Sequence, residues 1–335
     1  MKKHLFPESA RFYKANLHCH TTLSDGELTP QRVKEEYKKR GYAVVAFTDH
    51  EALIDQGHLS DDTFIALNGY ETCIKEEMVS THGMLRVHHI NFIKKKPNDT
   101  VQFCFCPENF TPGRCRDQIP FLKFVGDRCA YEYTPEFFKH LVGEAHKNGC
   151  LVHYNHPLWS LQSAETLSEL EGFDGLEIMN TGCRAHGDFD AHVYEALLRR
   201  GKRYYVVAGD DNHNDKGSFE DSFGGFTMIA AETFTYEGIT DALSRGDAYV
   251  SSGPLIEKAY VENGLLVVRT SPAASIRVLT EGREILRKDG EGGYIDGAAF
   301  PLTKKHLGSY FRIEVVDKNG NHAYTRAYEI KDHLD

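Results

Sequence analysis

The sequence has no long run of apolar residues. Its 335 residues have a mean hydropathy of -0.46 and include 26% charged residues. A membrane-spanning helix needs about 20 consecutive apolar residues, so the chain offers no candidate span. The first residues begin with lysines, and polar residues and a proline follow before any apolar run of signal-peptide length. We therefore expect a cytoplasmic protein with no membrane partner.

The chain also lacks an excess of basic residues. It has 39 Lys+Arg against 49 Asp+Glu, a formal net charge of -10. Residues 254–335 hold equal numbers of each, so the acidic excess lies before residue 254. Long nucleic acid requires a basic surface, and we expect none as a partner. An acidic region instead suits a site whose carboxylates are neutralised by bound cations.

Cysteines are present, 8 in all, but they do not form the paired C-x-x-C pattern. Without an export signal, they are expected to be reduced thiols rather than a disulfide framework. One group leaves two interpretations open, a separate zinc site or packed thiols, of which we favour the second. This group comprises Cys104, Cys106, Cys115 and Cys129.

What the chain does contain is a series of short apolar runs that end in His, Asp or Glu. Helix-like segments separate the runs, which is typical of a repeating βα fold. Thr29-Pro30 and Thr134-Pro135 each predict a helix start, with a threonine cap and proline in the first turn. Parallel strands would place all their carboxyl ends on one face, where barrel active sites lie. The polar residues at these ends are His18, His20, Asp49, His50, Glu71, His88, His89, His156, Glu177, Asn180, Asp210, Asp211 and His213.

So many imidazoles and carboxylates in one place predict bound metal ions. Without cations the cluster would be costly to bury, and its carboxylates would repel one another. Imidazole with carboxylate suits zinc, iron or manganese, and the residues suffice for two or three divalent ions. In such sites a carboxylate commonly bridges neighbouring ions, and a bridging water attacks a phosphoryl or carbonyl centre. We expect Glu71 to be the bridge, and a metal-bridging hydroxide rather than a side chain to be the nucleophile.

Six motifs carry a resemblance to a known family: "HCHTTLSDG", "FTDH", "GYE", "HHINF", "NHP" and "GDDNH". In order and spacing they resemble the PHP (polymerase and histidinol phosphatase) family of metal-dependent phosphoesterases, over about residues 12–253. The resemblance implies a distorted (β/α)7 TIM-like barrel with a trinuclear site. By position it implies three ligand sets: His18, His20, Glu71 and Asp211; Glu71, His89 and His156; and Asp25, His50 and His213.

The neighbours of these ligands receive supporting roles. His82 and His88 lie close to His89 in sequence, and we expect His88 to face outward because adjacent strand residues face opposite sides. Asp49 and Asp210 are expected to orient ligating imidazoles from outside the metal shell.

Candidate substrate residues lie in two places. Residues 94–133 exceed an ordinary loop and predict an insertion near the active-site face. Its arginines, Arg114, Arg116 and Arg128, could clamp a phosphate or carboxylate, although a solvated basic loop fits equally well. After the sixth strand, Arg184 is the first candidate for recognising substrate charge and Asn180 the second, and His186 is a candidate general acid.

From residue 254 the pattern changes to period-two strands, and Asn319-Gly320 predicts a hairpin. We expect two domains, a metal-dependent hydrolase barrel at 1–253 and a small β-sandwich-like domain at 254–335. The second would serve packing, dimerisation or as a wall for substrate. The run "AYVSSGP" before it resembles the branch of the family that includes carbaryl hydrolase-like proteins.

The sequence therefore predicts a phosphoesterase that hydrolyses a small phosphorylated metabolite of the nucleotide or sugar phosphate class. Two alternatives stay open. One is an ester or amide hydrolase of the carbaryl hydrolase-like type that uses the same metal cluster. The other is a noncatalytic metal-binding module.

Overall fold

The computed structural model describes residues 2–76, 86–106, 114–128, 130–187, 189–302 and 307–334. Predictions that involve His82, Cys129 and the side chains of Cys104 and Arg128 fall outside what the structure describes. Within these ranges, no helix is long and apolar enough to cross a bilayer.

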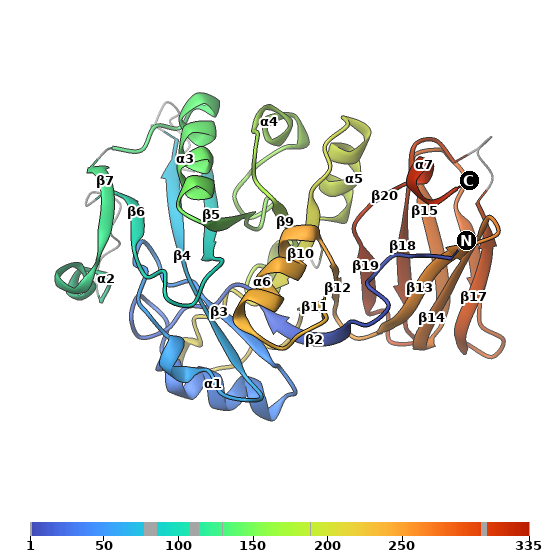
Figure 1. The fold of residues 1–335 in the computed structure, drawn as a ribbon, viewed down its shortest axis with the longest axis horizontal. Coiled ribbons are helices and arrows are strands. Elements are labelled where there is room, and N and C mark those ends of the chain that lie inside the picture. Colours follow the sequence, from blue (N-terminus) through green and yellow to red (C-terminus); the bar gives the residue numbers. More distant parts are fainter. Residues whose placement is uncertain are drawn as a thin grey trace.

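The fold is mixed α/β, and its larger part is one curved sheet (Figure 1). Eight strands of this sheet follow the order β10-β9-β8-β5-β4-β3-β2-β11. β2, β3 and β4 are parallel, as are β8, β9 and β10. Their bounds are β2 Arg11–Asn16, β3 Val44–Phe47, β4 Ile65–Lys75, β5 Val87–Lys94, β8 Cys150–Tyr154, β9 Gly175–Asn180, β10 Tyr205–Gly209 and β11 Phe226–Ala231.

The expectation that the strands bearing the polar motifs all run the same way is wrong for β5. β5 pairs antiparallel with both β4 and β8, and β11 pairs antiparallel with β2. His88 and His89 therefore stand at the beginning of β5 rather than at its end. Because β5 is reversed, its beginning lies at the same face as the carboxyl ends of its neighbours.

The two ends of this eight-stranded arrangement meet without a regular ladder in the described residues. Beyond the strands, the Asp211 amide donates to the His18 carbonyl (2.9 Å) and the His20 amide to the Asn212 carbonyl (3.2 Å). The Thr227 hydroxyl bonds both main-chain groups of Ala208, at 2.8 and 3.0 Å. These bonds hold the end of β10 beside the end of β2. The motif that contains His18 and His20 therefore lies next to the motif that contains Asp210 and Asp211.

Both predicted threonine-proline helix starts are confirmed. Thr29 accepts a hydrogen bond from the Arg32 amide, and Thr134 accepts one from Phe137. Helix α3 buries Phe138, Leu141, Val142 and Ala145 against the sheet, and burying each of the larger side chains contributes about 1.5–3 kcal/mol. In Figure 1, α3, α4 and α5 lie along the top of the view and α1 at the bottom, with strands of the large sheet between them. The helices are α1 Pro30–Lys39, α2 Cys115–Gln118, α3 Pro135–Lys147, α4 Ala164–Glu169, α5 Ala191–Arg199, α6 Tyr236–Arg245 and α7 Ile330–His333.

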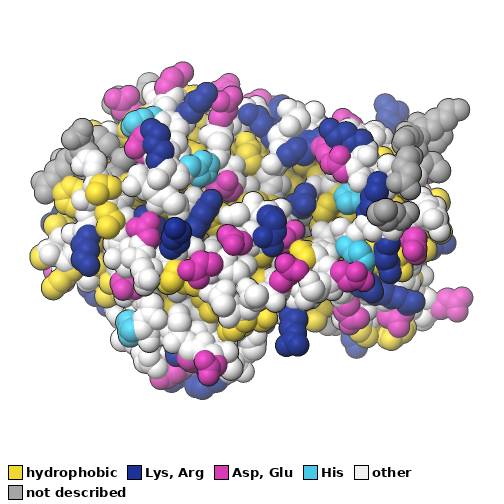
Figure 2. All heavy atoms as spheres, viewed as in Figure 1, with side chains coloured by type: hydrophobic (Ala, Val, Ile, Leu, Met, Phe, Trp, Pro, Cys, Tyr) yellow, Lys and Arg dark blue, Asp and Glu magenta, His cyan; other side chains and the backbone are white. Residues whose placement is uncertain are grey.

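The predicted insertion contains more regular structure than its sequence indicates. β6 (Gln102–Phe105) and β7 (Phe124–Arg128) form a separate parallel pair, with α2 between them. Cys115 of α2 is buried against Ala52, which lies two residues after His50. Apolar side chains are exposed on the insertion, as the yellow spheres at the left of Figure 2 show: Ile119, Phe121, Phe124 and Val125.

The β-rich character of the C-terminal region is confirmed, with two antiparallel sheets. One has the order β1-β13-β14-β17, formed by Lys3–His4, Ile256–Glu262, Leu265–Ala273 and Ile295–Pro301. The other continues the large sheet through β12-β19-β18-β15-β16, with β20 beside β18: Ala248–Ser251, His322–Thr325, Tyr310–Val316, Ser275–Thr280, Leu286–Asp289 and Tyr328–Glu329. Asn319-Gly320 lies in the turn between β18 and β19, as predicted. A single apolar cluster spans both regions, and the division at residue 254 stays a prediction.

Candidate metal centre

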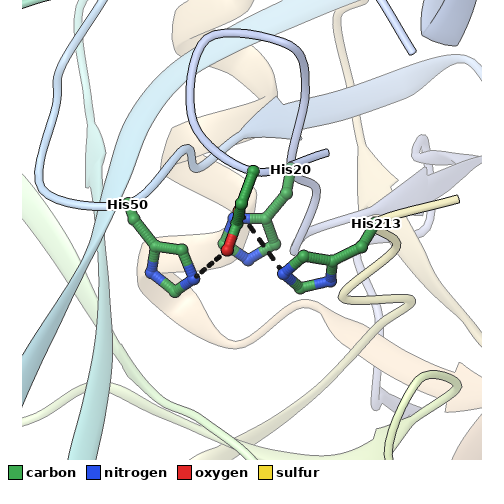
Figure 3. A group of neighbouring side chains, drawn as sticks. His20, His50 and His213 are labelled. Carbon is green, nitrogen blue, oxygen red and sulfur yellow. Dashed lines mark ion pairs between the residues drawn. The ribbon is translucent and has the colours of Figure 1, made fainter. Parts of the chain in front are cut away.

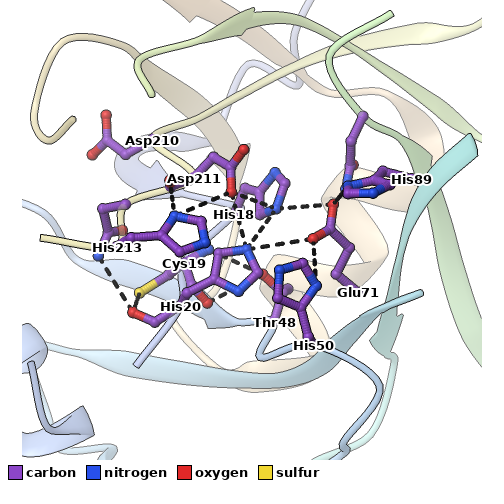
Figure 4. Close-up of polar contacts among 12 residues, drawn as sticks. His18, Cys19, His20, Thr48, His50, Glu71, His89, Asp210, Asp211 and His213 are labelled. Atoms are coloured by element: carbon purple, nitrogen blue, oxygen red, sulfur yellow. Dashed lines mark hydrogen bonds and ion pairs between the residues drawn. The ribbon is translucent and has the colours of Figure 1, made fainter. Parts of the chain in front are cut away.

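Glu71 lies at the centre of the polar cluster, with imidazoles around its carboxylate (Figure 4). Its Oε1 atom lies 3.3 Å from His18 Nε2, 3.0 Å from His89 Nδ1 and 3.4 Å from His156 Nε2. Its Oε2 atom lies 3.4 Å from His20 Nε2 and 3.1 Å from His50 Nδ1. One buried carboxylate thus faces five imidazoles. The shared position expected of Glu71 is present in the geometry.

Asp211 completes the first of the predicted ligand sets. Its Oδ1 atom lies 3.0 Å from His20 Nε2 and 3.3 Å from His18 Nε2. His18, His20, Glu71 and Asp211 form a group whose ligand atoms all lie within 4.8 Å of one another. Asp211 adopts a positive φ of 53°, a conformation that non-glycine residues adopt rarely and that recurs at functional sites.

The second group consists of Asp25 and three histidines from different parts of the chain. Figure 3 shows these histidines, His20, His50 and His213. His50 Nε2 lies 3.4 Å from Asp25 Oδ2, and His213 Nε2 lies 3.5 Å from Asp25 Oδ1. His20 Nδ1 is 3.8 Å from the same Oδ1 atom. His20 therefore lies between the first group and this one, a double position that the sequence does not indicate. This group is also the more open to solvent, since the Asp25 side chain is 39% exposed.

Glu71, His89 and His156 form the third predicted group. His88, by contrast, points away from the centre: its Nδ1 lies 2.7 Å from the Tyr154 hydroxyl, and its ring stacks on Tyr133. The choice of His89 over His88 therefore agrees with the geometry. All nine predicted ligand residues are brought together by the fold.

Glu177 belongs to the cluster but is absent from the predicted ligand sets. It forms a fourth group with His18 and His156. His18 Nδ1 lies 3.2 Å from Glu177 Oε1, and the His156 amide donates to Glu177 Oε2 at 3.0 Å. The sequence holds one signal for this role, a lone acid inside the apolar run "GLEIMN" of a buried strand.

The donor atoms fit a divalent cation. Three buried atoms in the cluster have no hydrogen-bond partner in the described structure: His20 Nδ1, Glu71 Oε2 and His156 Nε2. Imidazole nitrogens approach Glu71 Oε2, but without hydrogen-bond geometry. Each unpartnered buried polar atom costs about 1–3 kcal/mol. Nitrogen and oxygen atoms that converge without bonding one another match the ligand set of zinc, iron or manganese.

The charges of the cluster point the same way. Burial lowers the pKa of His20, but the adjacent carboxylates of Asp211 and Glu71 outweigh it and raise that pKa to about 10. Burial favours a raised pKa for Glu71, yet the charges of His89 and His18 hold it well below its usual range. Positive charge between the carboxylates of Glu71 and Asp211 is therefore favourable. A bound divalent cation would supply it, and a ligating imidazole must be without its proton to bind one.

Asp49 and Asp210 support the site differently from the prediction that they orient imidazoles. Asp49 Oδ1 accepts hydrogen bonds from the Thr21 amide (2.8 Å) and the Ser24 hydroxyl (2.7 Å), which fixes the loop that carries Asp25. Asp210 accepts from Tyr37, Thr181 and the Phe223 amide. Within the described residues, neither carboxylate forms a hydrogen bond to an imidazole. The imidazoles of His18, His156 and His213 instead lie against Glu177, Ser160 and the Asp211 carbonyl.

Asn180, a predicted substrate residue, holds the carboxylates of the cluster. Its side-chain amide donates to Glu177 Oε2 at 2.9 Å and to Asp211 Oδ2 at 3.2 Å, and its oxygen accepts from the Cys183 amide. All of its polar atoms are therefore engaged within the protein. Recognition of substrate by Asn180 would require it to release one of these partners.

The other predicted substrate residues separate into two places. The Arg184 guanidinium lies so close to Gly224 that a Cβ atom at Gly224 would collide with its Nη2. It lines a groove with the Asn319–His322 hairpin segment of the C-terminal region. His186 is exposed and lines a small cleft beside His156. His186 therefore lies near His156 and the polar cluster, whereas Arg184 faces the Asn319–His322 hairpin segment.

Arg114 uses its donors to hold a loop rather than to face substrate. Its Nη2 donates to the Gly26 carbonyl at 2.7 Å, and its Nε to the Ser24 carbonyl at 3.3 Å. These carbonyls flank Asp25. Arg116 on the same short helix is exposed. The insertion therefore supports the Asp25 group from outside, together with the Cys115 contact to Ala52.

Replacing Arg114 with alanine is expected to weaken metal binding at the Asp25 group by about tenfold or more, because changes to residues that support metal ligands typically cost 10–100-fold in affinity. Calorimetric titration of metal-free protein with Mn²⁺ measures the effect. Arg116→Ala is the matched control and should bind as the wild type does. Equal affinities in both variants would show that the contact to the Asp25 loop is not needed.

No protein-family model and no curated protein matches the sequence. Solved structures that match include a two-domain protein from Bacteroides vulgatus described as containing a predicted PHP-like metal-dependent phosphoesterase, at 14% identity, with 97% of this chain and 98% of that chain covered and a TM-score of 0.43. A candidate metal-dependent phosphoesterase from Bifidobacterium adolescentis is 15% identical, with 59% and 87% covered and a TM-score of 0.37. An amidohydrolase from Chromobacterium violaceum, solved with sulfate and without metal, is 18% identical, with 59% and 87% covered and a TM-score of 0.40. The structural neighbours are thus PHP-like metal-dependent phosphoesterases and an amidohydrolase, at low sequence identity.

Proposed function

We propose that the protein is a metal-dependent phosphoesterase that hydrolyses a small phosphorylated metabolite. The observation that carries the proposal is the position of Glu71, one buried carboxylate among five imidazoles that is common to two ligand groups. A shared carboxylate of this kind is the usual device for holding two cations a few ångströms apart.

Three groups would hold the cations: His18, His20, Glu71 and Asp211; Glu71, His89 and His156; and His20, Asp25, His50 and His213. Zinc, iron or manganese bound there would lower the pKa of a water molecule and offset the charge of the phosphate. This division agrees with the family resemblance of the motifs, with His20 added to the set of Asp25, His50 and His213.

The residues around these groups fix the ligands. Glu177 lies at His18 Nδ1 and Ser160 at His156 Nδ1, so in both rings the Nε2 atom is directed to the centre. The Asp211 carbonyl does the same for His213. Partners of this kind set the tautomer and orientation of a ligating imidazole. His186, in the cleft beside His156, is placed to give a proton to a leaving group.

A panel of phosphomonoesters, phosphodiesters and carboxylic esters, assayed with Zn²⁺, Mn²⁺ and Fe²⁺, tests the proposal. We expect turnover of phosphate esters that depends on added metal. Turnover of carboxylic esters or amides alone would support the alternative hydrolase. Metal binding without turnover of any panel member would leave the noncatalytic module as the correct interpretation.

The single tryptophan of the chain gives a direct reading of metal binding. The Trp159 ring centroid lies 5.2 Å from that of His89 and 5.0 Å from that of His156. Addition of Mn²⁺ to metal-free protein is expected to quench the tryptophan emission in proportion to bound metal. Mg²⁺, which prefers oxygen ligands and water to imidazole, is the control and should leave the emission unchanged. Unchanged emission with Mn²⁺ bound would place the metal elsewhere.

A further inference from the structure

The turn after His156 exposes three large apolar side chains in four residues. Leu158, Trp159 and Leu161 are 36%, 41% and 43% exposed. Large apolar side chains gathered at the edge of a polar site commonly mark a surface that a ligand covers. Because Pro157 joins this turn directly to His156, the exposed side chains adjoin the candidate metal centre.

The backbone of this turn is held in an unfavourable conformation. His156 has φ of 25° and Leu161 has φ of 59°, although neither is glycine. Main-chain bonds fix the turn, from the Ser160 amide to the His156 carbonyl (3.1 Å) and from Gln162 to Pro157 (2.9 Å). A non-glycine residue in this region costs about 1–3 kcal/mol and persists where the surroundings impose it. Backbone strain and exposed apolar side chains therefore occur together in this turn, beside the candidate metal centre.

A small cleft lies between this turn and the segment after β9. Its lining includes Leu158 and Trp159 from the turn, Phe189 and Asp190 from the segment after β9, and His156. Asp190 is 8% exposed, and its Oδ1 atom has no hydrogen-bond partner in the described structure. The cleft has a volume of about 10 Å³, room for about one water molecule, so a larger group would rest on the exposed side chains at its edge.

We propose that this surface binds an aromatic group of the substrate, with Trp159 stacked on the ring. The proposal rests on the proposed function and names its substrate class: esters in which an aromatic or heteroaromatic ring lies within a few bonds of the phosphate. Trp159 offers a large flat face that is only partly covered by His89 and His156. A ring seated on it would lie beside the ligands of the third group while its phosphate reached the centre.

Two phosphates with similar alcohol leaving groups test the inference, benzyl phosphate and ethyl phosphate. Stacking on tryptophan contributes about 1–3 kcal/mol, so we expect kcat/KM to favour benzyl phosphate by about tenfold or more in the metal-loaded protein. In Trp159→Ala the preference should fall to about twofold, and Trp159→Phe should keep part of it. Leu265→Ala is the control, because Leu265 is similarly exposed (42%) but lies in β14 of the C-terminal region.

A binding measurement makes the result independent of turnover. Benzylphosphonate and ethylphosphonate are titrated calorimetrically into the same metal-loaded variants, and the same preference and the same loss are expected. Equal affinities for the two in the wild type, or a preference that survives in Trp159→Ala, would overturn the inference. Absence of hydrolysis with the binding preference intact would instead defeat only the proposed phosphoesterase activity.

Discussion

Replacing Glu71 with glutamine is expected to lower kcat/KM by at least about a thousandfold and to remove at least one equivalent of bound metal. A single group that stabilises charge in the reaction is worth about a hundred- to a thousandfold. Glu71 also connects two ligand groups, and an amide, being neutral, cannot offset two cations. The five imidazoles around it would lose their shared counter-charge.

The control for this variant is Glu76→Gln. Glu76 follows β4, the strand that carries Glu71, but it is paired with Arg86 away from the cluster. It should keep both the activity and the metal content of the wild type. Metal content is measured by plasma mass spectrometry on protein purified with and without added Mn²⁺ or Zn²⁺. Full metal content with activity within tenfold of wild type in Glu71→Gln would remove Glu71 from its central role.

Removal of metal by a chelator is expected to lower the melting temperature by roughly 10 °C as well as to abolish activity. A ligand that binds only the folded state at a thousand times its Kd stabilises it by about 4 kcal/mol per site. For chains of a few hundred residues, each kcal/mol corresponds to a shift of about 2–4 °C. The cations also relieve the unpartnered atoms His20 Nδ1, Glu71 Oε2 and His156 Nε2.

The measurement is differential scanning calorimetry of chelated and metal-restored protein. Glu71→Gln should show a smaller difference between the two states, in proportion to the equivalents it has lost. Protein that is demonstrably metal-free yet melts at the temperature of the loaded wild type would show that the cluster is stable without cations. It would also remove the argument from the unpartnered atoms.

The grouping of the nine candidate ligand residues could be predicted from the sequence because each stands in a short motif at the edge of an apolar run. Their convergence follows from general rules for strands and connections. The role of Glu177 could not be separated in the same way, since an acid inside "GLEIMN" is compatible with any polar partner that the fold brings near it. Asn180 and Arg114 show the same limit: the sequence indicates that they lie near the site, while only the structure shows that their donors are already engaged.

The direction of β5 is a different case. Only eleven residues separate the end of β4 at Lys75 from the start of β5 at Val87. A parallel crossover needs a dozen residues or more, usually with a helix, whereas antiparallel neighbours accept shorter links. The length of this connection therefore indicates that β5 is antiparallel to β4. The motif "HHINF" does not indicate a direction, because a histidine pair at either end of a strand can reach the same site.

The pairing of β1 with β13 bears on how the chain is made. Lys3 lies opposite Val261 in that ladder. β1 is therefore synthesised long before the strand with which it pairs. The edge of β12 likewise waits for β19. During synthesis the histidine motif after β2 is therefore exposed before its sheet is complete, and the nascent chain presents unpaired strand edges for most of its translation.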